Sequence, residues 1–304
     1  MVLANRIAII DLGSNTFHLL IVDILEGHPD LIEIFRKRTF VYLSKGGIDV
    51  IEEEKIQEGL ECIYEFNQYC AEFGVGKIHA VGTSSLRSAK NSHIFLNQVY
   101  EQTSIQIEIL SGEEEAILIH KGISTFLNHI DAHSLIMDIG GGSVEFISII
   151  SGEFQDFASV DLGISVLRSL LKHSDPIKKD ELNESMKYID QSLSGFFKKM
   201  ISSGPTALIG ASGPFEIINS MCGGSDVNDI IEISREEVIS IADKVISSTL
   251  SERSMLKGMP LDRADLSLES MILIKYVLDK LPTIAKMIVS PYALKEGVIA
   301  EQYF

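Results

Sequence analysis

Two segments of the chain, residues 6–21 and 133–148, repeat one pattern of residue types that could hold a phosphate and a cation. In each, an apolar stretch ends in an aspartate, a glycine follows two places later, and a small-residue turn precedes a second apolar stretch. This pattern predicts a β-hairpin with a tip of small residues. The matching positions, 127 residues apart, are Asp11 with Asp138, Gly13 with Gly140, and Thr16 with Ser143.

The two predicted tips carry groups that bind an anion. Consecutive backbone N–H groups in such a turn can form a concave anion site, and the hydroxyls of Ser14 and Ser143 add donors. A tight turn alone would explain the glycines, but the repetition favours a phosphate site, with the two tips facing each other across a cleft. The candidate binding residues are Gly13, Ser14, Asn15, Gly140, Gly141, Gly142 and Ser143.

The aspartates that end these strands are candidate ligands of a divalent cation, because such cations prefer carboxylate oxygens. Asp138 is the stronger candidate, since Glu145 lies seven residues on, where the hairpin would bring the two carboxylates near each other. Asp11 takes the equivalent place in the first hairpin, with His18 where the second has Glu145. An Asx turn would also explain either aspartate, and a ligand contact of His18 is left open.

Hydrolysis of a phosphoanhydride also needs a general base and further positive charge. Three consecutive glutamates, Glu113 to Glu115, follow Ser111, and Ser111-x-x-Glu114 forms a capping box at the start of a predicted helix. The residues alone leave all three open as the base. Arg87 follows a predicted buried strand, where ligands bind in α/β folds, and its guanidinium suits phosphate. A surface arginine at a helix start is the alternative.

Taken together, these motifs resemble those of the exopolyphosphatase and guanosine pentaphosphate phosphatase family, within the acetate kinase, Hsp70 and actin superfamily. The resemblance runs from about residue 6 to residue 303. It rests on the two hairpins and on three further segments: Gly82-Thr83-Ser84-Ser85-Leu86-Arg87, Ser111-Gly112-Glu113-Glu114-Glu115-Ala116, and Ser290-Pro-Tyr-Ala-Leu-Lys-Glu-Gly297.

The resemblance implies Glu115, the glutamate before Ala116, as the catalytic base, and Arg87 as a phosphate ligand. It also implies Mg²⁺, or another divalent cation, at Asp138, Glu145 and Asp11. The implied function is an exopolyphosphatase that removes the terminal phosphate of inorganic polyphosphate, with guanosine pentaphosphate as the alternative substrate. An ATP-dependent small-molecule kinase and a non-catalytic nucleotide sensor are more distant alternatives. The segment Gly210–Pro214 resembles the third ligand loop of the superfamily, and its role is left open.

The sequence departs from the family pattern at three places. Val144 stands where the family usually has threonine. The segment that begins at Arg263 resembles one that more often contains Pro-Gly. The chain ends at Phe304, before the helical C-terminal domains of long members, so it is expected to be the short two-domain form. The preferred length of a polyphosphate substrate is therefore left open.

The composition excludes some classes of partner. A net charge of −17 argues against non-specific binding to nucleic acid. No apolar run is long enough for a membrane span, and no leader precedes the first strand, so we expect no membrane partner and a cytoplasmic protein. The three cysteines lack the spacing of a metal site. A homodimer is left open. Besides Arg87, the basic residues that could supply positive charge to a phosphate site are Lys37, Arg38, Lys45, Lys90 and Lys121. A solvated surface charge is the alternative for each of them.

Predicted strands and helices alternate through both halves, which indicates two actin-like (ribonuclease H-like) α/β domains. The expected division is residues 1–128 and 129–304, with a short hinge near 125–133 and a last helix that could pack back on the first domain. Strands are expected at 6–12, 16–24, 31–43, 77–82, 105–110, 133–138, 143–150, 153–160, 206–209 and 285–289. Helices are expected at 53–73, 92–103, 111–128, 164–173, 178–200, 267–281 and 291–303, and after Pro214 and Ser234.

Overall fold

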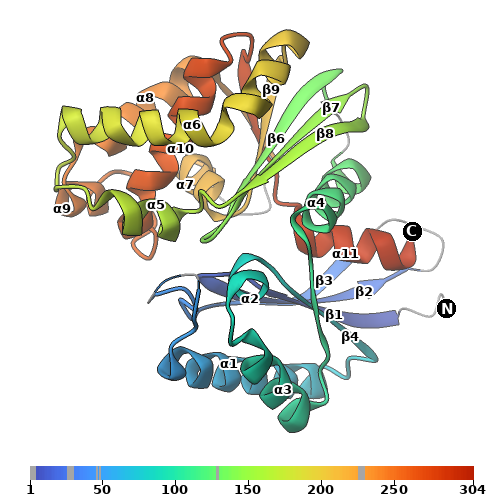
Figure 1. The fold of residues 1–304 in the computed structure, drawn as a ribbon. Helices are drawn as coiled ribbons and strands as arrows, with labels where there is room; N and C mark the ends of the chain where they lie inside the picture. Colours follow the sequence, from blue (N-terminus) through green and yellow to red (C-terminus); the bar gives the residue numbers. More distant parts are fainter. Residues whose placement is uncertain (1–4, 26–30, 46, 48, 128–129, 225–229) are drawn as a thin grey trace. The chain divides into compact units, whose positions relative to one another are not determined.

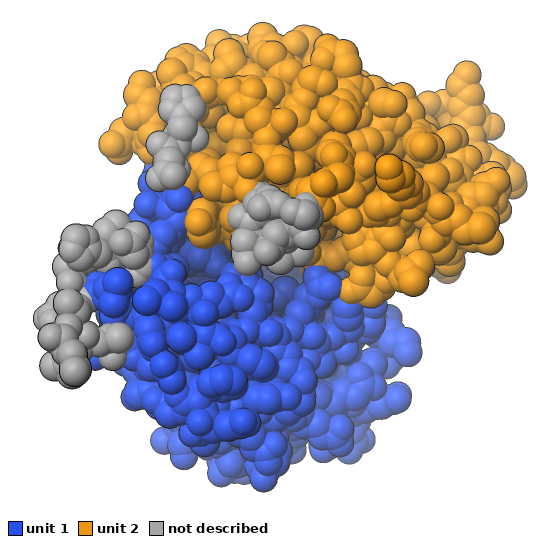
Figure 2. All heavy atoms as spheres, turned by 180° about the vertical axis from the view of Figure 1, so that it is seen from behind, with its two compact units in different colours: residues 1–126, 294–304 blue, residues 127–293 orange. Residues whose placement is uncertain are grey.

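The computed structural model describes residues 5–25, 31–45, 47, 49–127, 130–224 and 230–304. Tertiary contacts divide the chain into unit 1, Met1–Phe126 with Leu294–Phe304, and unit 2, Leu127–Ala293 (Figure 2). The last helix therefore belongs to unit 1. The boundary expected between residues 128 and 129 lies outside the described residues. Both units are mixed α/β folds (Figure 1).

Unit 1 is built on a sheet with the strand order β3-β2-β1-β4-β5 in its described part. Strands β1, β2 and β3 pair antiparallel, whereas β4 and β5 run parallel to β1. The carboxyl ends of β1 and β4 therefore meet at one edge, where Leu12 pairs with Gly82. The strands are β1 (Asn5–Leu12), β2 (Thr16–Ile24), β3 (Leu31–Phe40), β4 (Lys77–Gly82) and β5 (Ile107–Ile109).

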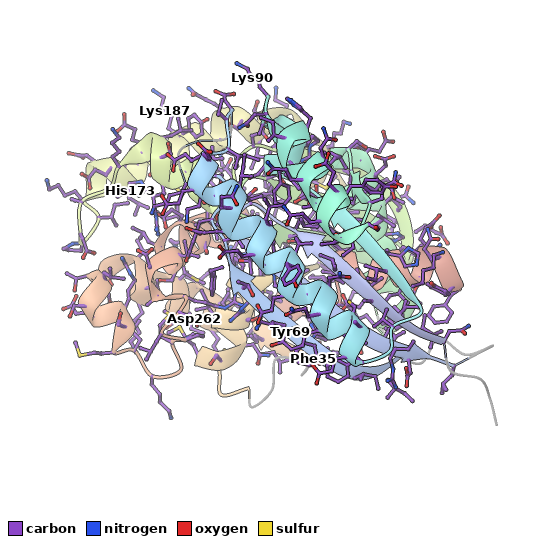
Figure 3. All side chains as sticks on the ribbon, turned by 90° about the horizontal axis from the view of Figure 1, so that it is seen from below. Phe35, Tyr69, Lys90, His173, Lys187 and Asp262 are labelled. Atoms are coloured by element: carbon purple, nitrogen blue, oxygen red, sulfur yellow. The ribbon has the colours of Figure 1, made fainter. Side chains whose placement is uncertain are left out.

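Helices cover both faces of this sheet (Figure 1). On one face, Phe35 of β3 lies against Tyr69 of α1, with ring centroids 4.7 Å apart (Figure 3). On the other face, α4 and α11 cross closely, because a Cβ at Gly297 would lie 1.8 Å from the carbonyl oxygen of Leu118. The helices are α1 (Glu53–Glu72), α2 (Ser84–Ser88), α3 (Ser92–Thr103), α4 (Gly112–Phe126) and α11 (Leu294–Tyr303).

Unit 2 is built on a sheet with the strand order β10-β11-β9-β6-β7-β8 in its described part. Strand β6 pairs antiparallel with β7 and parallel with β9, so the ends of β6 and β9 share an edge. The strands are β6 (His133–Ile139), β7 (Val144–Ile150), β8 (Glu153–Val160), β9 (Ala207–Ala211), β10 (Ile231–Ser234) and β11 (Lys286–Val289).

The core of unit 2 joins this sheet to its helices through aromatic contacts. The Phe146 ring of β7 packs on Phe196 of α6, with centroids 5.7 Å apart, and Phe197 packs on Tyr276 of α10 at 5.6 Å. The helices are α5 (Ile164–Leu171), α6 (Lys179–Ser203), α7 (Gly213–Met221), α8 (Arg235–Ser247), α9 (Leu250–Ser254), the 3₁₀ turn η1 (Ala264–Leu266) and α10 (Ser267–Lys280).

The described part of the chain contains no helix with both the length and the apolar character needed to span a membrane.

Candidate active site

The tip of the first hairpin in unit 1 is a tight turn closed by a backbone hydrogen bond. The N–H of Gly13 donates to the carbonyl oxygen of Thr16 at 3.0 Å, and a Cβ at Gly13 would lie 3.0 Å from the same oxygen. Since the Gly13 N–H is engaged in the turn, an anion at this tip would have to contact other groups. The Ser14 hydroxyl is one such group: Ser14 is 3% exposed, and its Oγ has no hydrogen-bond partner among the described residues.

Asp11, at the end of β1, lies opposite His18 of β2 in the strand register. Burial lowers the pKa of His18 well below its usual value, and the nearby charges of Lys295, Arg38 and Arg36 lower this pKa further. His18 is therefore a neutral imidazole near pH 7. The first hairpin thus pairs its aspartate with a neutral ring rather than with a second carboxylate.

The glutamates at the start of α4 lie in different environments, which the sequence could not separate. Glu114 closes the expected capping box: its Oε2 accepts from the Ser111 N–H at 2.8 Å, and the Ser111 Oγ accepts from the Glu114 N–H at 3.2 Å. Glu113 and Glu114 are exposed, whereas Glu115 is 6% exposed. Of the three, Glu115 therefore has the burial expected of a group with a role inside the protein.

Arg87 contacts Glu115 directly. Its Nη1 donates to Oε2 of Glu115 at 3.0 Å and to the carbonyl oxygen of Leu110 at 2.7 Å. The short helix α2, which begins just after β4, brings Arg87 to the start of α4. The structure therefore joins the two residues that the sequence singled out separately, 28 positions apart.

The tip of the second hairpin in unit 2 repeats the turn of the first. The Gly140 N–H donates to the carbonyl oxygen of Ser143 at 2.9 Å, and a Cβ at Gly140 would lie 3.1 Å from that oxygen. The duplication seen in the sequence therefore extends to the hydrogen bond that closes each turn.

Three successive carbonyl groups of this second tip turn toward the start of α5. The N–H groups of Ile164, Ser165 and Gly163 donate to the carbonyl oxygens of Gly140, Gly141 and Gly142 at 3.1, 2.9 and 3.0 Å. A trans peptide directs its N–H opposite to its C=O. The next three N–H groups, those of Gly141, Gly142 and Ser143, therefore point away from α5 in one direction. Such a run of parallel N–H groups has the geometry of a nest that can bind an anion.

Asp138 and Glu145 form a directly opposed pair on β6 and β7, beside this nest. Asp138 is 8% and Glu145 1% exposed, and Ser159 donates to Oε1 of Glu145 at 2.8 Å. Opposed residues have Cβ atoms about 4.5–5.5 Å apart, and two like charges there repel. A divalent cation would offset this repulsion.

The donor set of this pair fits Mg²⁺, which proteins hold through one or two carboxylates, with water and substrate phosphate completing the shell. Among the described residues, no three His, Cys, Asp or Glu side chains gather as a metal cluster. Asp11, the third residue expected to contact the cation, belongs to unit 1, whereas Asp138 and Glu145 belong to unit 2.

Comparison with known proteins assigns the family. Residues 20–303 match the model of the Ppx/GppA phosphatase family. The chain belongs to this family. A solved exopolyphosphatase from Cytophaga hutchinsonii is 32% identical, with a TM-score of 0.90, over 97% of this chain and 96% of that one. The Aquifex aeolicus PPX-GPPA enzyme has a TM-score of 0.81 at 23% identity, over 99% of this chain and 100% of that one.

Among curated proteins, the guanosine-5'-triphosphate,3'-diphosphate pyrophosphatase of Vibrio vulnificus is 26% identical over 298 residues. That match covers 97% of this chain and 58% of the relative, so the chain spans little more than half the length of the curated relatives it matches. The expected class, a two-domain actin-like α/β fold of the Ppx/GppA type, is confirmed.

The sequence did not indicate the role of Ser212, which lies between β9 and α7 in the segment that resembles the superfamily's third loop. The Ser212 hydroxyl donates to the carbonyl oxygen of Ile139 at 3.0 Å and accepts from the Ile139 N–H at 3.2 Å. Its φ of +75° is unusual for a residue other than glycine. In this Ppx/GppA protein, the third loop is therefore tied to the strand end that carries Asp138. The only sequence signal was the Gly-Ala-Ser-Gly-Pro pattern.

Proposed function

We propose that the protein is an exopolyphosphatase, which hydrolyses the terminal phosphoanhydride of inorganic polyphosphate and releases orthophosphate. One observation carries the proposal: in unit 2, three successive N–H groups point in one direction beside the opposed carboxylates of Asp138 and Glu145. A site with an anion nest next to a cation-binding pair suits a phosphate chain with a bound divalent cation. The similarity to the Cytophaga exopolyphosphatase over almost the full length of both chains supports this substrate.

In this proposal, each hairpin tip contributes donors to the phosphate oxygens. Ser14 and Asn15 act at the first tip, whose turn Gly13 makes, and Gly141, Gly142 and Ser143 act at the second, whose turn Gly140 makes. The fork of Arg87 binds a phosphate oxygen, since guanidinium groups bind phosphate with charge-assisted hydrogen bonds. Because the same Nη1 donates to Glu115 in the structure, phosphate competes with Glu115 for it.

The chemical step is an attack by water on the terminal phosphorus. Glu115 accepts the proton of the water, the bond between phosphorus and the bridging oxygen breaks, and the bridging oxygen leaves on the shortened chain. Mg²⁺, held by Asp138 and Glu145 with Asp11 as a further contact, would neutralise negative charge on the phosphate oxygens. Burial keeps bulk water away from Glu115, which strengthens its interaction with the attacking water.

Guanosine pentaphosphate is the second candidate substrate, because the curated relatives are named as pyrophosphatases of guanosine-5'-triphosphate,3'-diphosphate. The same residues would act on its 5'-terminal phosphate. We place the protein in the cytoplasm, since Cys62, Cys70 and Cys222 are free thiols, as a reducing compartment requires.

Phosphate release tests the proposal. The full chain would be assayed on tripolyphosphate, long-chain polyphosphate, guanosine pentaphosphate and ATP, with Mg²⁺ or with EDTA. An exopolyphosphatase releases orthophosphate from both polyphosphates only with the cation. Release confined to guanosine pentaphosphate would favour the second candidate, and transfer of the ATP phosphate to an acceptor instead of water would identify a kinase.

A further inference from the structure

Four serine hydroxyls in unit 1 are buried and lack hydrogen-bond partners among the described residues, and three of them lie in neighbouring segments; the fourth is the Oγ of Ser124. The three neighbours are the Oγ atoms of Ser14, Ser44 and Ser85, on residues that are 3%, 6% and 2% exposed. A buried hydroxyl without a partner loses the hydrogen bonds that it would make to water, so each such group calls for an explanation. Three of them in neighbouring segments call for a common one.

Backbone contacts bring these segments together. The N–H of Ser44 donates to the carbonyl oxygen of Ser14 at 3.4 Å, so the loop after β3 lies on the first hairpin tip. The N–H of Thr83 donates to the carbonyl oxygen of Leu12 at 3.2 Å, and Ser85 follows within the first turn of α2. All three hydroxyls therefore belong to segments that meet where β1 and β4 end, on the loop edge of the sheet.

The loop that carries Ser44 is held in an unfavourable backbone conformation. Tyr42 and Val41 both donate their N–H groups to the carbonyl oxygen of Asn15, at 3.0 and 2.9 Å, and Tyr42 has a φ of +54°. A left-handed conformation is sterically unfavourable in a residue other than glycine. Such strain persists where the surroundings fix the position of a functional group, here the loop that places Ser44 beside Ser14.

Hydroxyl donors that are buried, unpaired and adjacent to a proposed phosphate tip suit a tetrahedral oxyanion, whose oxygens accept hydrogen bonds in several directions. We propose that Ser44 and Ser85 are further phosphate-contacting residues that donate, with Ser14, to one phosphate group of the substrate. This inference rests on the proposed function and adds to it two residues outside the motifs of the hairpin tips. It also explains why a strongly acidic protein can hold a polyanion with few cations.

Alanine variants at these serines test the inference, because a phosphate ligand and a structural role predict opposite results. Removing an unpartnered buried hydroxyl should leave the Tm of the ligand-free protein unchanged or raise it. The same change should raise the KM for tripolyphosphate and the Kd for inorganic phosphate, measured by calorimetry, about tenfold each, as the loss of a hydrogen bond to a charged acceptor does. The variants are Ser44→Ala, Ser85→Ala and the double variant.

Ser124→Ala is the matched control, since the Ser124 Oγ on α4 is also buried and unpartnered. Its Tm should be unchanged or raised, as in Ser44→Ala and Ser85→Ala. Its KM for tripolyphosphate and its Kd for inorganic phosphate should equal those of the parent. Unchanged KM and Kd in both serine variants of an active parent would overturn the inference and leave the proposed function standing. A lowered Tm would also overturn it, because the hydroxyls would then serve packing. A parent that releases no phosphate but binds inorganic phosphate through these serines would overturn only the proposed function.

Discussion

The guanidinium of Arg87 and the carboxylate of Glu115 form an ion pair in unit 1, with Nη1 3.0 Å from Oε2. Arg87 keeps 24% of its side-chain surface exposed, whereas Glu115 keeps 8%. The arginine thus remains accessible to an arriving phosphate while it holds the buried glutamate. In the proposed mechanism, a phosphate that takes over Nη1 would leave the carboxylate of Glu115 to orient water, so one nitrogen would couple substrate binding to exposure of the base.

Replacing Glu115 by glutamine should abolish most turnover and preserve binding. The amide keeps the shape of the side chain but cannot accept a proton, so kcat should fall by about 10²-fold or more. The KM for tripolyphosphate should change little. Steady-state phosphate release measures both constants, and Glu113→Gln, a change at an exposed position of the same helix turn, is the control. A folded Glu115→Gln enzyme with near-parental kcat would rule out this residue as the base.

Replacing Arg87 by lysine should weaken substrate binding more than it slows the chemical step. Lysine keeps the charge but loses the planar fork that binds phosphate and contacts both Glu115 and Leu110. We expect a higher KM, with a larger increase for long polyphosphate than for tripolyphosphate. Steady-state kinetics on tripolyphosphate and on long polyphosphate test this expectation. Equal KM values for variant and parent on both substrates would show that Arg87 does not contact the substrate.

Much of this arrangement was predictable, because it follows from local signals. The repeated hairpins gave the Asp138–Glu145 pairing, since residues at fixed offsets across a two-stranded turn must face each other. The capping boxes at Ser111 and Ser234 marked the starts of α4 and α8, and both side chains accept the expected N–H. Strands β1, β2, β7 and β8 lie within a residue or so of their expected ranges.

Features that depend on contacts between distant residues were not predictable. Strand β10 was missed because its four residues are fixed by pairing with β11, more than 50 positions later. Helices α2 and α9 have five residues each, too few to show a helical period, although the Thr249–Glu252 capping box was a usable signal for α9. The expected strand 31–43 ends at Phe40, because the next residues turn to bond with Asn15. The same contact brings Ser44 to Ser14.

Neutralising Asp138 should weaken activation by Mg²⁺ more than it affects folding. In Asp138→Asn the opposed carboxylate pair loses one charge and one strong oxygen ligand, so the half-activating Mg²⁺ concentration should rise at least tenfold. Removing the like-charge repulsion with Glu145 should leave the Tm of the metal-free protein unchanged or higher. Activity titrations with Mg²⁺ and thermal unfolding in EDTA measure the two effects. If the half-activating Mg²⁺ concentration of the variant equals that of the parent, Asp138 does not bind the cation and serves only the turn.

The C-terminal helix should loosen from unit 1 at acid pH through His79. The ring of His79 on β4 shares a hydrogen bond of 2.9 Å with the Tyr303 hydroxyl of α11. Burial, followed by the charge of Lys77, lowers the pKa of His79. The unfolded chain, with a pKa of about 6.5, therefore binds the proton first, so stability is full above that pH and falls as the pH drops toward the folded pKa.

Thermal unfolding between pH 7.5 and 5 measures this loss. His79→Gln, which can still hydrogen-bond but does not titrate, should flatten the dependence of Tm on pH. His93→Gln, a change at an exposed position of α3, should retain the parental slope. If the His79 variant and the parent lose Tm in parallel on acidification, the ring does not control the attachment of α11.

Substituting Gly163 should displace the backbone of the second hairpin tip, against which this residue packs. This glycine is the N-cap of α5 and has an ordinary φ of −60°, so alanine would meet no backbone strain. Its Cβ, however, would lie 2.4 Å from backbone atoms of Gly141 and Gly142, which cannot yield without moving the tip. The three N–H groups aligned by α5 would then lose their common direction. We expect Gly163→Ala to lower phosphate release at least tenfold and to cost about 1–3 kcal/mol in stability, as overpacking does.

Gly195 provides the opposite case within the same unit. It lies inside α6, and a Cβ there would meet nothing within 4 Å. Gly195→Ala should stabilise the fold by about 0.5–1 kcal/mol through helix propensity and leave catalysis unchanged. Chemical denaturation and phosphate release on both variants separate the effects. If Gly163→Ala were as active as Gly195→Ala, the hydrogen bonds between α5 and the tip would have no part in binding phosphate, and the assignment of the tip as the phosphate nest would fail with them.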